Sequence, residues 1–217
     1  MTEGKKIIAI LGGTGNEGPG LALRWASAGY KIIIGSRQVE KAKATAEELN
    51  NILGGNYIIG MQNNEAAKSA DISVLTVVQS AHQPALKSLK EALKGKILVD
   101  ATARVEFRDP KPPSPPAAAE IAQEILGSDV RVVAAFQNVP AHALKKLEEP
   151  IASEVLVCAD DVQAAQDVME LAEDGGMKAY YAGLLTNAVT VEGLTALLIS
   201  INKYYKKRTA SIRITGL

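Results

Sequence analysis

The sequence predicts an α/β protein with a Rossmann-type, doubly wound parallel sheet and a small C-terminal α/β domain. Short apolar runs alternate along residues 7–136 with amphipathic segments, which is the pattern of successive βα units. The first unit also holds a complete G-x-G-x-x-G between a strand-like and a helix-like run. In that setting the motif indicates dinucleotide binding.

The expected elements follow from the apolar periodicity of each segment. The run ISVLTVV is apolar throughout, as expected of a central strand covered on both faces. We expect strands at 7–11, 31–34, 57–61, 72–78, 97–99 and 131–136. We expect helices at 18–28, 38–53, 63–70, 83–93 and 117–126.

The composition changes near residue 145, and we place a domain boundary there. Residues 1–145 would bind the dinucleotide, and residues 146–217 would form a small domain that closes the substrate cleft. The stretch 103–116 contains five prolines and is predicted to be a loop, either functional or a passive linker. In the second part we expect strands at 154–158, 178–181 and 212–217, and helices at 161–173 and 186–206.

The composition is that of a soluble globular protein. Of 217 residues, 47% are hydrophobic, and 24 basic residues balance 24 acidic ones, so no basic surface for nucleic acid is expected. The single cysteine, Cys158, is predicted to be a core thiol in a reducing compartment. No signal peptide is visible, and no apolar run approaches the ~20 residues of a membrane span. We therefore expect a cytoplasmic protein without membrane partners.

The glycine-rich turn has the residue types that a pyrophosphate site needs. Gly13 permits a tight turn, Gly15 leaves room for the pyrophosphate, and Gly18 lets the following helix pack closely on the sheet. The N–H groups of that helix start then face the phosphates. Glu17 is unexpected, because a carboxylate would repel a pyrophosphate unless it pointed to solvent. A glycine-rich turn without a ligand is the alternative.

The end of the second strand indicates which dinucleotide binds. An NAD site usually has Asp or Glu about 20 residues after the glycines. This chain has Ser36 and Arg37 there, and Lys41 one helical turn further. A hydroxyl and two cations suit a 2′-phosphate, whereas cations in the first turn of an unliganded helix are unfavourable. We therefore favour NADP over NAD, with an ordinary solvated helix start as the alternative.

Other candidates for chemistry are few. His82 and His142 each follow a strand end, and we favour a solvent-facing loop position for both over contact with a ligand. Asp100 ends a strand and is interpreted as a cap. No metal-ligand spacing, nucleophile elbow or P-loop lysine is present. No acid–base pair stands out either, so we predict no metal and no catalytic side chain. A hydride passing directly between two organic cofactors would suit this absence, because it needs positioning more than proton transfer.

Four blocks of the sequence together resemble the F420-dependent NADP oxidoreductases. They are AILGGTGNEGPGLALRWASAGYKIIIGSRQVEKA at 9–42, DISVLTV at 71–77, AFQNVPA at 135–141 and AGLLTNAVTVEGLTALLISIN at 182–202. The first block is shared with the cytosolic domains of membrane ferric reductases, and the last two are more specific. The resemblance implies hydride transfer between NADPH and the deazaflavin coenzyme F420, in a cleft between two domains.

The resemblance also implies which residues bind each ligand. For NADP they are Gly13, Thr14, Gly15, Asn16, Glu17, Gly18, Ser36, Arg37, Lys41, Val78, Gln79 and Ala141. For the deazaflavin they are Gln137, Asn138, Val139, Pro140, Leu185 and Asn187.

The chain departs from the family pattern at three places near the second ligand. Family members often have His where Gln137 stands, and the segments 78–80 and 102–104 also differ. A flavin, a ferric chelate or an imine as acceptor, or a non-catalytic NADP-binding protein, therefore stay open as alternatives. The long apolar helix at 186–205 would suit the interface of a homodimer, with a place in the core as the alternative.

Overall fold

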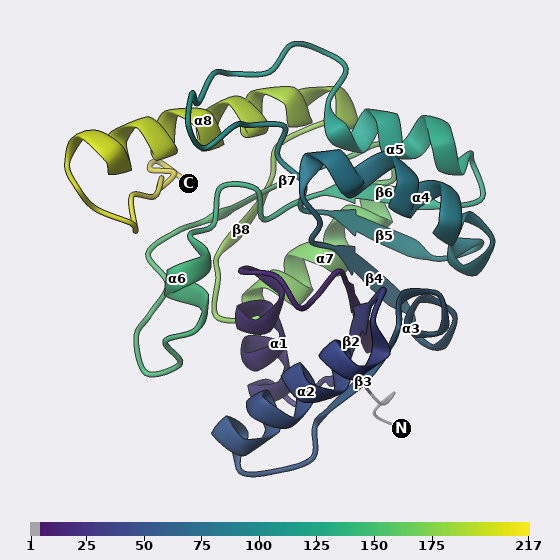
Figure 1. Cartoon of the computed structure of the whole chain (residues 1–217). Helices are drawn as coiled ribbons and strands as arrows, with labels where there is room; N and C mark the ends of the chain where they lie inside the picture. Colours follow the sequence, from purple (N-terminus) through teal and green to yellow (C-terminus); the bar gives the residue numbers. More distant parts are fainter. Residues whose placement is uncertain (1–4) are drawn as a thin grey trace.

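One eight-stranded sheet organises the part of the chain that the computed structural model describes, residues 5–217 (Figure 1). The strand order is β3-β2-β1-β4-β5-β6-β7-β8, so consecutive units run outward in both directions from β1 and β4. All neighbouring pairs are parallel except β6 and β7. The point between β1 and β4, where the strand order reverses, is where ligands bind in open sheets of this kind.

The strands are short and rich in β-branched residues. The central strands β1, β4, β5 and β6 are covered on both faces, which explains why their sequences are apolar without alternation. The strands of the sheet are β1 Ile7–Leu11, β2 Lys31–Ser36, β3 Ile58–Gln62, β4 Ile72–Leu75, β5 Ile97–Asp100, β6 Arg131–Ala134, β7 Val155–Ala159 and β8 Ala179–Tyr181.

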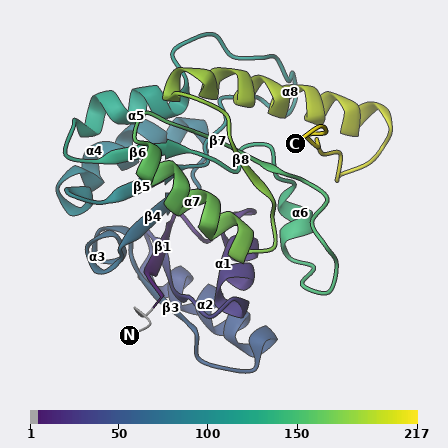
Figure 2. The ribbon, with the colours of Figure 1, turned by 180° about the vertical axis from the view of Figure 1, so that it is seen from behind.

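Helices cover both faces of the sheet, as the opposite views in Figures 1 and 2 show. One buried apolar cluster joins the sheet to α1, α2 and α7, and a second joins it to α3, α4, α5 and α8. The helices are α1 Gly18–Ser27, α2 Val39–Leu53, α3 Asn63–Ser69, α4 Gln79–Leu93, α5 Ala118–Leu126, α6 Ala141–Leu144, α7 Val162–Asp174 and α8 Ala188–Tyr204, with a 3₁₀ turn η1 at Leu185–Asn187.

The sheet continues across the expected boundary at residue 145 through the antiparallel pairing of β6 with β7. Side chains of α1 also reach α7: the Trp25 indole donates to the Leu171 carbonyl at 2.8 Å. The Trp25 ring meets Phe136 edge-on, with centroids 5.7 Å apart. The division into 1–145 and 146–217 stays a prediction.

Several elements differ from those expected. Residues 212–217 form no strand; the Glu154 N–H donates to the Ile212 carbonyl at 3.4 Å, and the Glu154 carboxylate accepts from the Ile214 N–H, without a ladder. The strand expected at 72–78 ends at Leu75, and α4 begins at Gln79, ahead of the expected 83, because Pro84 is accommodated inside the helix. The short helix α6 was not expected.

The proline-rich stretch and the long apolar helix can each be compared with what the sequence predicts. Residues 103–116 contain no helix or strand, as their prolines predict. Leu185–Tyr204, in contrast to expectation, has the length and the mean hydropathy, 1.2, of a possible membrane span. By length and composition alone this is weak evidence, because the core helix of a soluble protein passes the same test. Here Ala188, Val191 and Leu198 are buried.

Candidate dinucleotide site and adjoining substrate site

The turn from β1 into α1 is held by its glycines. The Gly13 N–H donates to the carbonyls of Ile10 at 3.2 Å and Gly35 at 3.0 Å. A Cβ on Gly13 would lie 2.6 Å from the Ile10 oxygen, and a Cβ on Gly18 would lie 2.6 Å from the Gly13 Cα. The tight turn and the close approach of α1 therefore both require glycine, as the sequence indicates.

Two further residues support this turn, and the sequence patterns did not identify them. Gly12 has a φ of +72°, and a Cβ there would lie 2.6 Å from Val77 Cγ1. Its N–H donates to Asn63 Oδ1 at 3.1 Å, which ties the turn to the start of α3. The signal for Asn63 was its position directly after the third strand, at the same edge of the sheet.

A cavity of about 600 Å³ lies at this edge, beside the glycine turn and between β1, β2 and β4. Its size is in the range of sites for small molecules and cofactors. It is lined by Gly12, Thr14, Gly15, Ser36, Arg37, Gln38, Lys41, Asn63, Thr76, Val77, Val78, Ser80, Ala81, Pro84, Ala85 and Ser88.

The cavity brings together half of the residues predicted to bind NADP. The glycine turn contributes Thr14 and Gly15, the end of β2 and the start of α2 contribute Ser36, Arg37 and Lys41, and Val78 closes the opposite wall. Gly13 and Gly18 pack behind the turn, as described above. The remaining predicted residues, Asn16, Glu17, Gln79 and Ala141, are not among those that line this cavity.

The wall formed by α2 carries uncompensated positive charge. Arg37 and Lys41 are both exposed, and within residues 5–217 neither forms an ion pair. The nearby carboxylate of Glu40 is bonded to Lys43 at 3.1 Å. Because cations at a helix N-terminus are unfavourable without a partner, this wall suits an anion such as a phosphate.

Glu17 is half-buried, and its carboxyl group is turned partly into the protein and not wholly to solvent. Its Oε1 atom is buried and has no hydrogen-bond partner among the described residues. Burial raises the pKa of the Glu17 carboxyl to about 8. The group is therefore mostly protonated and neutral near pH 7, which removes the expected repulsion of a pyrophosphate.

The residues predicted to line the deazaflavin pocket begin in the loop after β6. Gln137, Asn138 and Val139 are buried, and the preceding Phe136 has a φ of +76°. Gln137 Nε2 donates to the Asp100 carbonyl at 2.9 Å, and Asn138 Nδ2 donates to the Glu154 carbonyl at 2.7 Å. This loop is thus fastened to the end of β5 on one side and to the start of β7 on the other.

The other predicted substrate residues stand at the entry to α8. Leu185 is buried, and its N–H donates to Asp160 Oδ1 at 3.0 Å. Asn187 is exposed and donates to the Ala182 carbonyl at 2.9 Å. Helix α8 reaches the loop after β6, because Thr195 Oγ1 donates to the Gln137 carbonyl at 2.8 Å.

Pro140 and Ala141 lead into α6, which is held against α1. Arg24 of α1 donates through Nε to the Leu144 carbonyl at 3.0 Å and through Nη2 to the Ala143 carbonyl at 3.3 Å. A Cβ on Gly20 would lie 2.5 Å from Leu144 Cβ. The loop that follows β6 is therefore positioned relative to the helix that starts at the glycine turn.

The expectation of a solvent-facing His82 was wrong. His82 lies in α4 and is only 3% exposed, with its Nε2 atom 2.6 Å from Asp100 Oδ2. Asp100 is fully buried, and its Oδ1 also accepts from the Thr102 N–H at 3.0 Å. The sequence signal was the spacing of His82 from Leu86 and Leu89, which places it on the buried face once α4 starts at Gln79. His142 is exposed, as expected.

Cys158 is a buried core thiol, as predicted. Burial raises the pKa of its thiol to about 11, which disfavours the nucleophilic thiolate. Among residues 5–217 no group of three or more His, Cys, Asp and Glu side chains is placed to hold a metal ion.

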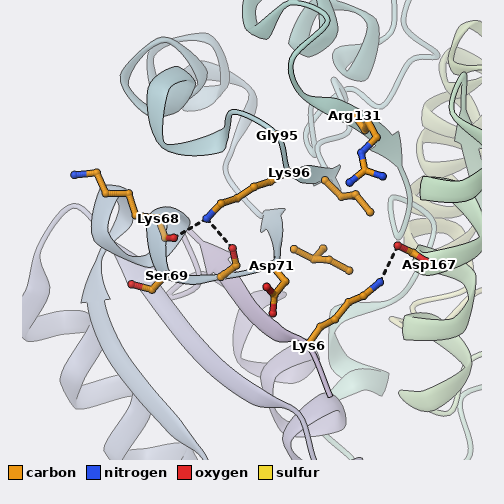
Figure 3. A pocket seen from close by; sticks show the side chains of 11 residues that line it. Lys6, Lys68, Ser69, Asp71, Gly95, Lys96, Arg131 and Asp167 are labelled. Atoms are coloured by element: carbon orange, nitrogen blue, oxygen red, sulfur yellow. Dashed lines mark hydrogen bonds and ion pairs between the residues drawn. The ribbon is translucent and has the colours of Figure 1, made fainter. Parts of the chain in front are cut away.

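A second cavity, of about 370 Å³, lies at the opposite edge of the sheet, where β1, β4, β5 and β6 begin (Figure 3). Lys96 Nζ donates there to the carbonyls of Ala67 and Ala70 at 2.7 Å, and Lys6 pairs with Asp167 at 2.8 Å. These two cations already have protein partners and are remote from the glycine turn.

The order of strands and the cavity at the switch point place the chain in the class of Rossmann-type nucleotide-binding folds. Residues 7–104 match the family described as NADP oxidoreductase, coenzyme F420-dependent. The F420-dependent NADP reductases of Methanothermobacter thermautotrophicus and Methanocaldococcus jannaschii are each 40% identical over 97% of this chain, and the alignments cover 95% and 98% of those proteins. The chain belongs to the F420-dependent NADP oxidoreductase family.

Solved structures and more remote relatives agree on the fold. A putative F420-dependent NADP reductase from Arthrobacter sp. FB24 has a TM-score of 0.82 over 98% of this chain and 100% of its own, at 23% identity. The human metalloreductase STEAP2 is 24% identical over 93% of this chain, which matches 38% of that protein. The fold class and the family expected from the sequence are thus confirmed.

Proposed function

We propose that the protein is an oxidoreductase that transfers a hydride directly between NADP(H) and coenzyme F420. The observation that carries the proposal is the cavity beside the glycine turn, whose wall presents Arg37 and Lys41 without ionic partners in the described part of the chain. The full-length relatives at 40% identity are F420-dependent NADP reductases, which supports the same pair of ligands.

On the NADP side, each part of the site suits one part of the ligand. Ser36, Arg37 and Lys41 would bind the 2′-phosphate, because a hydroxyl and two cations that form no ion pair among residues 5–217 line that wall. The segment 13–18 would bind the pyrophosphate at the N-terminus of α1, with Thr14 and Asn16 reaching the phosphates and ribose. Val78 and Gln79 would border the adenosine ribose or the nicotinamide side, and Ala141 would approach the nicotinamide.

On the deazaflavin side, we place the ring against the loop after β6. Gln137, Asn138, Val139 and Pro140 would form one wall, with Leu185 and Asn187 on another. The two cofactors carry the chemistry, so the protein contributes alignment of the two rings and exclusion of water. The described residues at this place include buried polar atoms without partners, which suits a ligand with polar groups.

The direct test is to mix NADPH, F420 and the purified protein. We expect the deazaflavin absorbance to bleach as the ring is reduced, and NADH to be a much poorer donor. No absorbance change would overturn the proposal. Turnover with a flavin, a ferric chelate or an imine alone would favour another reductase, and NADPH binding without any turnover would indicate a non-catalytic binding protein.

We also propose that the protein is a cytoplasmic homodimer formed through α8. Leu197 is 54% exposed and Ile201 is 37% exposed, so part of this apolar helix is not covered by the chain itself. The variant Leu197→Glu/Ile201→Glu is expected to be a monomer by light scattering, whereas Ile52→Glu on the exposed side of α2 should leave the mass unchanged. A monomeric unmodified protein would contradict the proposal.

A further inference from the structure

Hydrogen bonds determine which way the side-chain amides point in the loop after β6. A backbone carbonyl only accepts, so the amide nitrogen of Gln137 must face the Asp100 carbonyl, 2.9 Å away. Its oxygen, Oε1, must then point the other way. Oε1 is buried and has no partner within residues 5–217, and the whole residue is only 7% exposed.

Asn138 repeats this arrangement. Its Nδ2 donates to the Glu154 carbonyl at 2.7 Å, so Oδ1 faces away, and Oδ1 is again buried and unpartnered within the described residues. Thr102 Oγ1, two residues after Asp100, is a third such atom. The two amide oxygens only accept, and the Thr102 hydroxyl can accept as well. Buried polar atoms normally have partners, so these atoms after β5 and β6 suit a ligand that donates hydrogen bonds.

The carbonyl that orients Gln137 is itself held in place by a buried pair. Asp100 is fully buried, and its carboxylate accepts from the Thr102 N–H at 3.0 Å and lies 2.6 Å from His82 Nε2. Its carbonyl also accepts from the Ala135 N–H at 3.3 Å. A buried carboxylate without its donor would be unstable, so His82 stabilises the turn that carries the Asp100 carbonyl.

His82 connects the helix that lines the larger cavity to the turn after β5. It belongs to α4, whose first turns contribute Ser80 and Ala81 to the wall of the larger cavity. His82 contacts the Asp100 carboxyl group, and the Asp100 carbonyl accepts from the Gln137 side chain. The Gln137 carbonyl in turn accepts from Thr195 Oγ1 of α8 at 2.8 Å.

We propose that Gln137 Oε1 is a specificity-determining acceptor for a ring N–H of the second substrate, and that His82 and Asp100 are the residues that position it. The inference rests on the proposed function, in which that substrate is a deazaflavin. The pyrimidine part of such a ring carries an imide N–H between two carbonyls, which is a donor of the required kind. A hydrated ferric chelate presents no such donor at a defined place.

The first experiment changes Gln137 and measures the dissociation constant for F420 by quenching of its fluorescence, together with KM for both substrates. Gln137→Leu keeps the approximate size and removes the acceptor, so we expect F420 binding at least tenfold weaker and an unchanged KM for NADPH. Gln137→His should restore binding, because an imidazole donates to the Asp100 carbonyl through one nitrogen and accepts through the other. Gln163→Leu, on the exposed face of α7, is the matched control.

The second experiment tests the positioning role by a double-mutant cycle. We expect His82→Leu to weaken F420 binding severalfold in the unmodified chain and to have no further effect on binding in Gln137→Leu. A merely structural role would weaken binding equally in both backgrounds, while lowering the melting temperature of each. Equal losses would overturn the assignment of His82.

The two proposals fail in different ways. Unmodified protein that binds F420 without reducing it would contradict the proposed function, while the Gln137 series still measures the acceptor. Unchanged F420 binding in Gln137→Leu would overturn the inference and leave the function intact. No binding of F420 at all would overturn both.

Discussion

Three ionisable residues near the glycine turn, Arg37, Lys41 and Glu17, are better suited to binding a ligand than to stabilising the folded chain. Arg37 and Lys41 have no ionic partners within residues 5–217, so their charges do little for the folded chain. Glu17 has no hydrogen-bond partner for its buried Oε1 atom within residues 5–217, and its raised pKa favours the neutral form. Each is therefore better explained by a ligand than by the protein interior, and each gives a test at the scale of single residues.

The variants Arg37→Ala and Lys41→Ala should each raise KM for NADPH roughly ten- to a hundredfold, because a charge-assisted contact contributes about 1.5–3 kcal/mol. The effect on NADH, which lacks the 2′-phosphate, should be smaller. Steady-state kinetics with both cofactors measures the difference. Lys43→Ala is the control, since Lys43 is paired with Glu40 on the same helix. Equal losses for NADPH and NADH would refute the assignment.

Glu17 should make stability and NADPH affinity depend on pH. Its pKa in the folded protein is about 8 against an ordinary value of 4.5, so the folded state binds the extra proton between these values. The corresponding stability is present in full below the ordinary pKa and is lost as the pH rises through about 8. Above that pH, the ionised carboxylate should also weaken NADPH binding.

Glu17→Gln keeps the shape of the side chain and cannot ionise. The difference in melting temperature, variant minus unmodified protein, should therefore grow as the pH rises from about 5 to about 9. The NADPH affinity of the variant should no longer fall at alkaline pH. Thermal melts and binding titrations across this range measure both effects. Parallel pH profiles for the two proteins would show that Glu17 is not buried as described.

At the scale of elements, the glycines of the G-x-G-x-x-G turn between β1 and α1 are required for different structural reasons. A Cβ on Gly18 would collide with the backbone of Gly13, whereas a Cβ on Gly15 would meet its nearest atom, the Gly12 carbonyl oxygen, at 3.7 Å. Gly18 thus permits the packing of α1 on the sheet, and Gly15 leaves space on the ligand side.

This difference predicts opposite outcomes for two similar substitutions. Gly18→Ala should lower the free energy of unfolding by about 1–3 kcal/mol, as overpacking against backbone does. Gly15→Ala should leave stability nearly unchanged and weaken NADPH binding, because the methyl group would enter the cavity. Denaturant unfolding and NADPH titration of both variants measure the two effects. A destabilised Gly15→Ala with normal NADPH affinity would reverse the assignment.

The whole molecule is joined across the expected domain boundary by more than the β6–β7 pairing. Trp25 donates to the Leu171 carbonyl, and Tyr30 donates to Asp174 Oδ2 at 2.9 Å, so α1 and the turn that precedes β2 are fastened to α7. We expect one cooperative unfolding transition in calorimetry. NADP should raise its midpoint, because a ligand that binds only the native state stabilises it. Two separate transitions would instead support independent units at 1–145 and 146–217.

Local signals determined most of the fold. Continuous β-branched runs, amphipathic segments and a glycine motif between them act over short distances, so they are readable in order along the chain. They identified the sheet, the turn from β1 into α1, and the cations at Arg37 and Lys41. They failed for residues 212–217, where a β-branched composition finds no neighbouring strand, and for the start of α4, where Pro84 concealed the first turn.

Tertiary structure decided what depends on residues distant in sequence. The burial of Glu17 and the partner of His82 were invisible locally, because Asp100 belongs to a different strand and solvent exposure is a property of the packed chain. The directions of the Gln137 and Asn138 amides depend likewise on carbonyls of β5 and of the residue before β7. The sequence by itself determined the type of fold and the place of the dinucleotide. Long-range packing decided which polar groups are neutral, paired or left to meet a ligand.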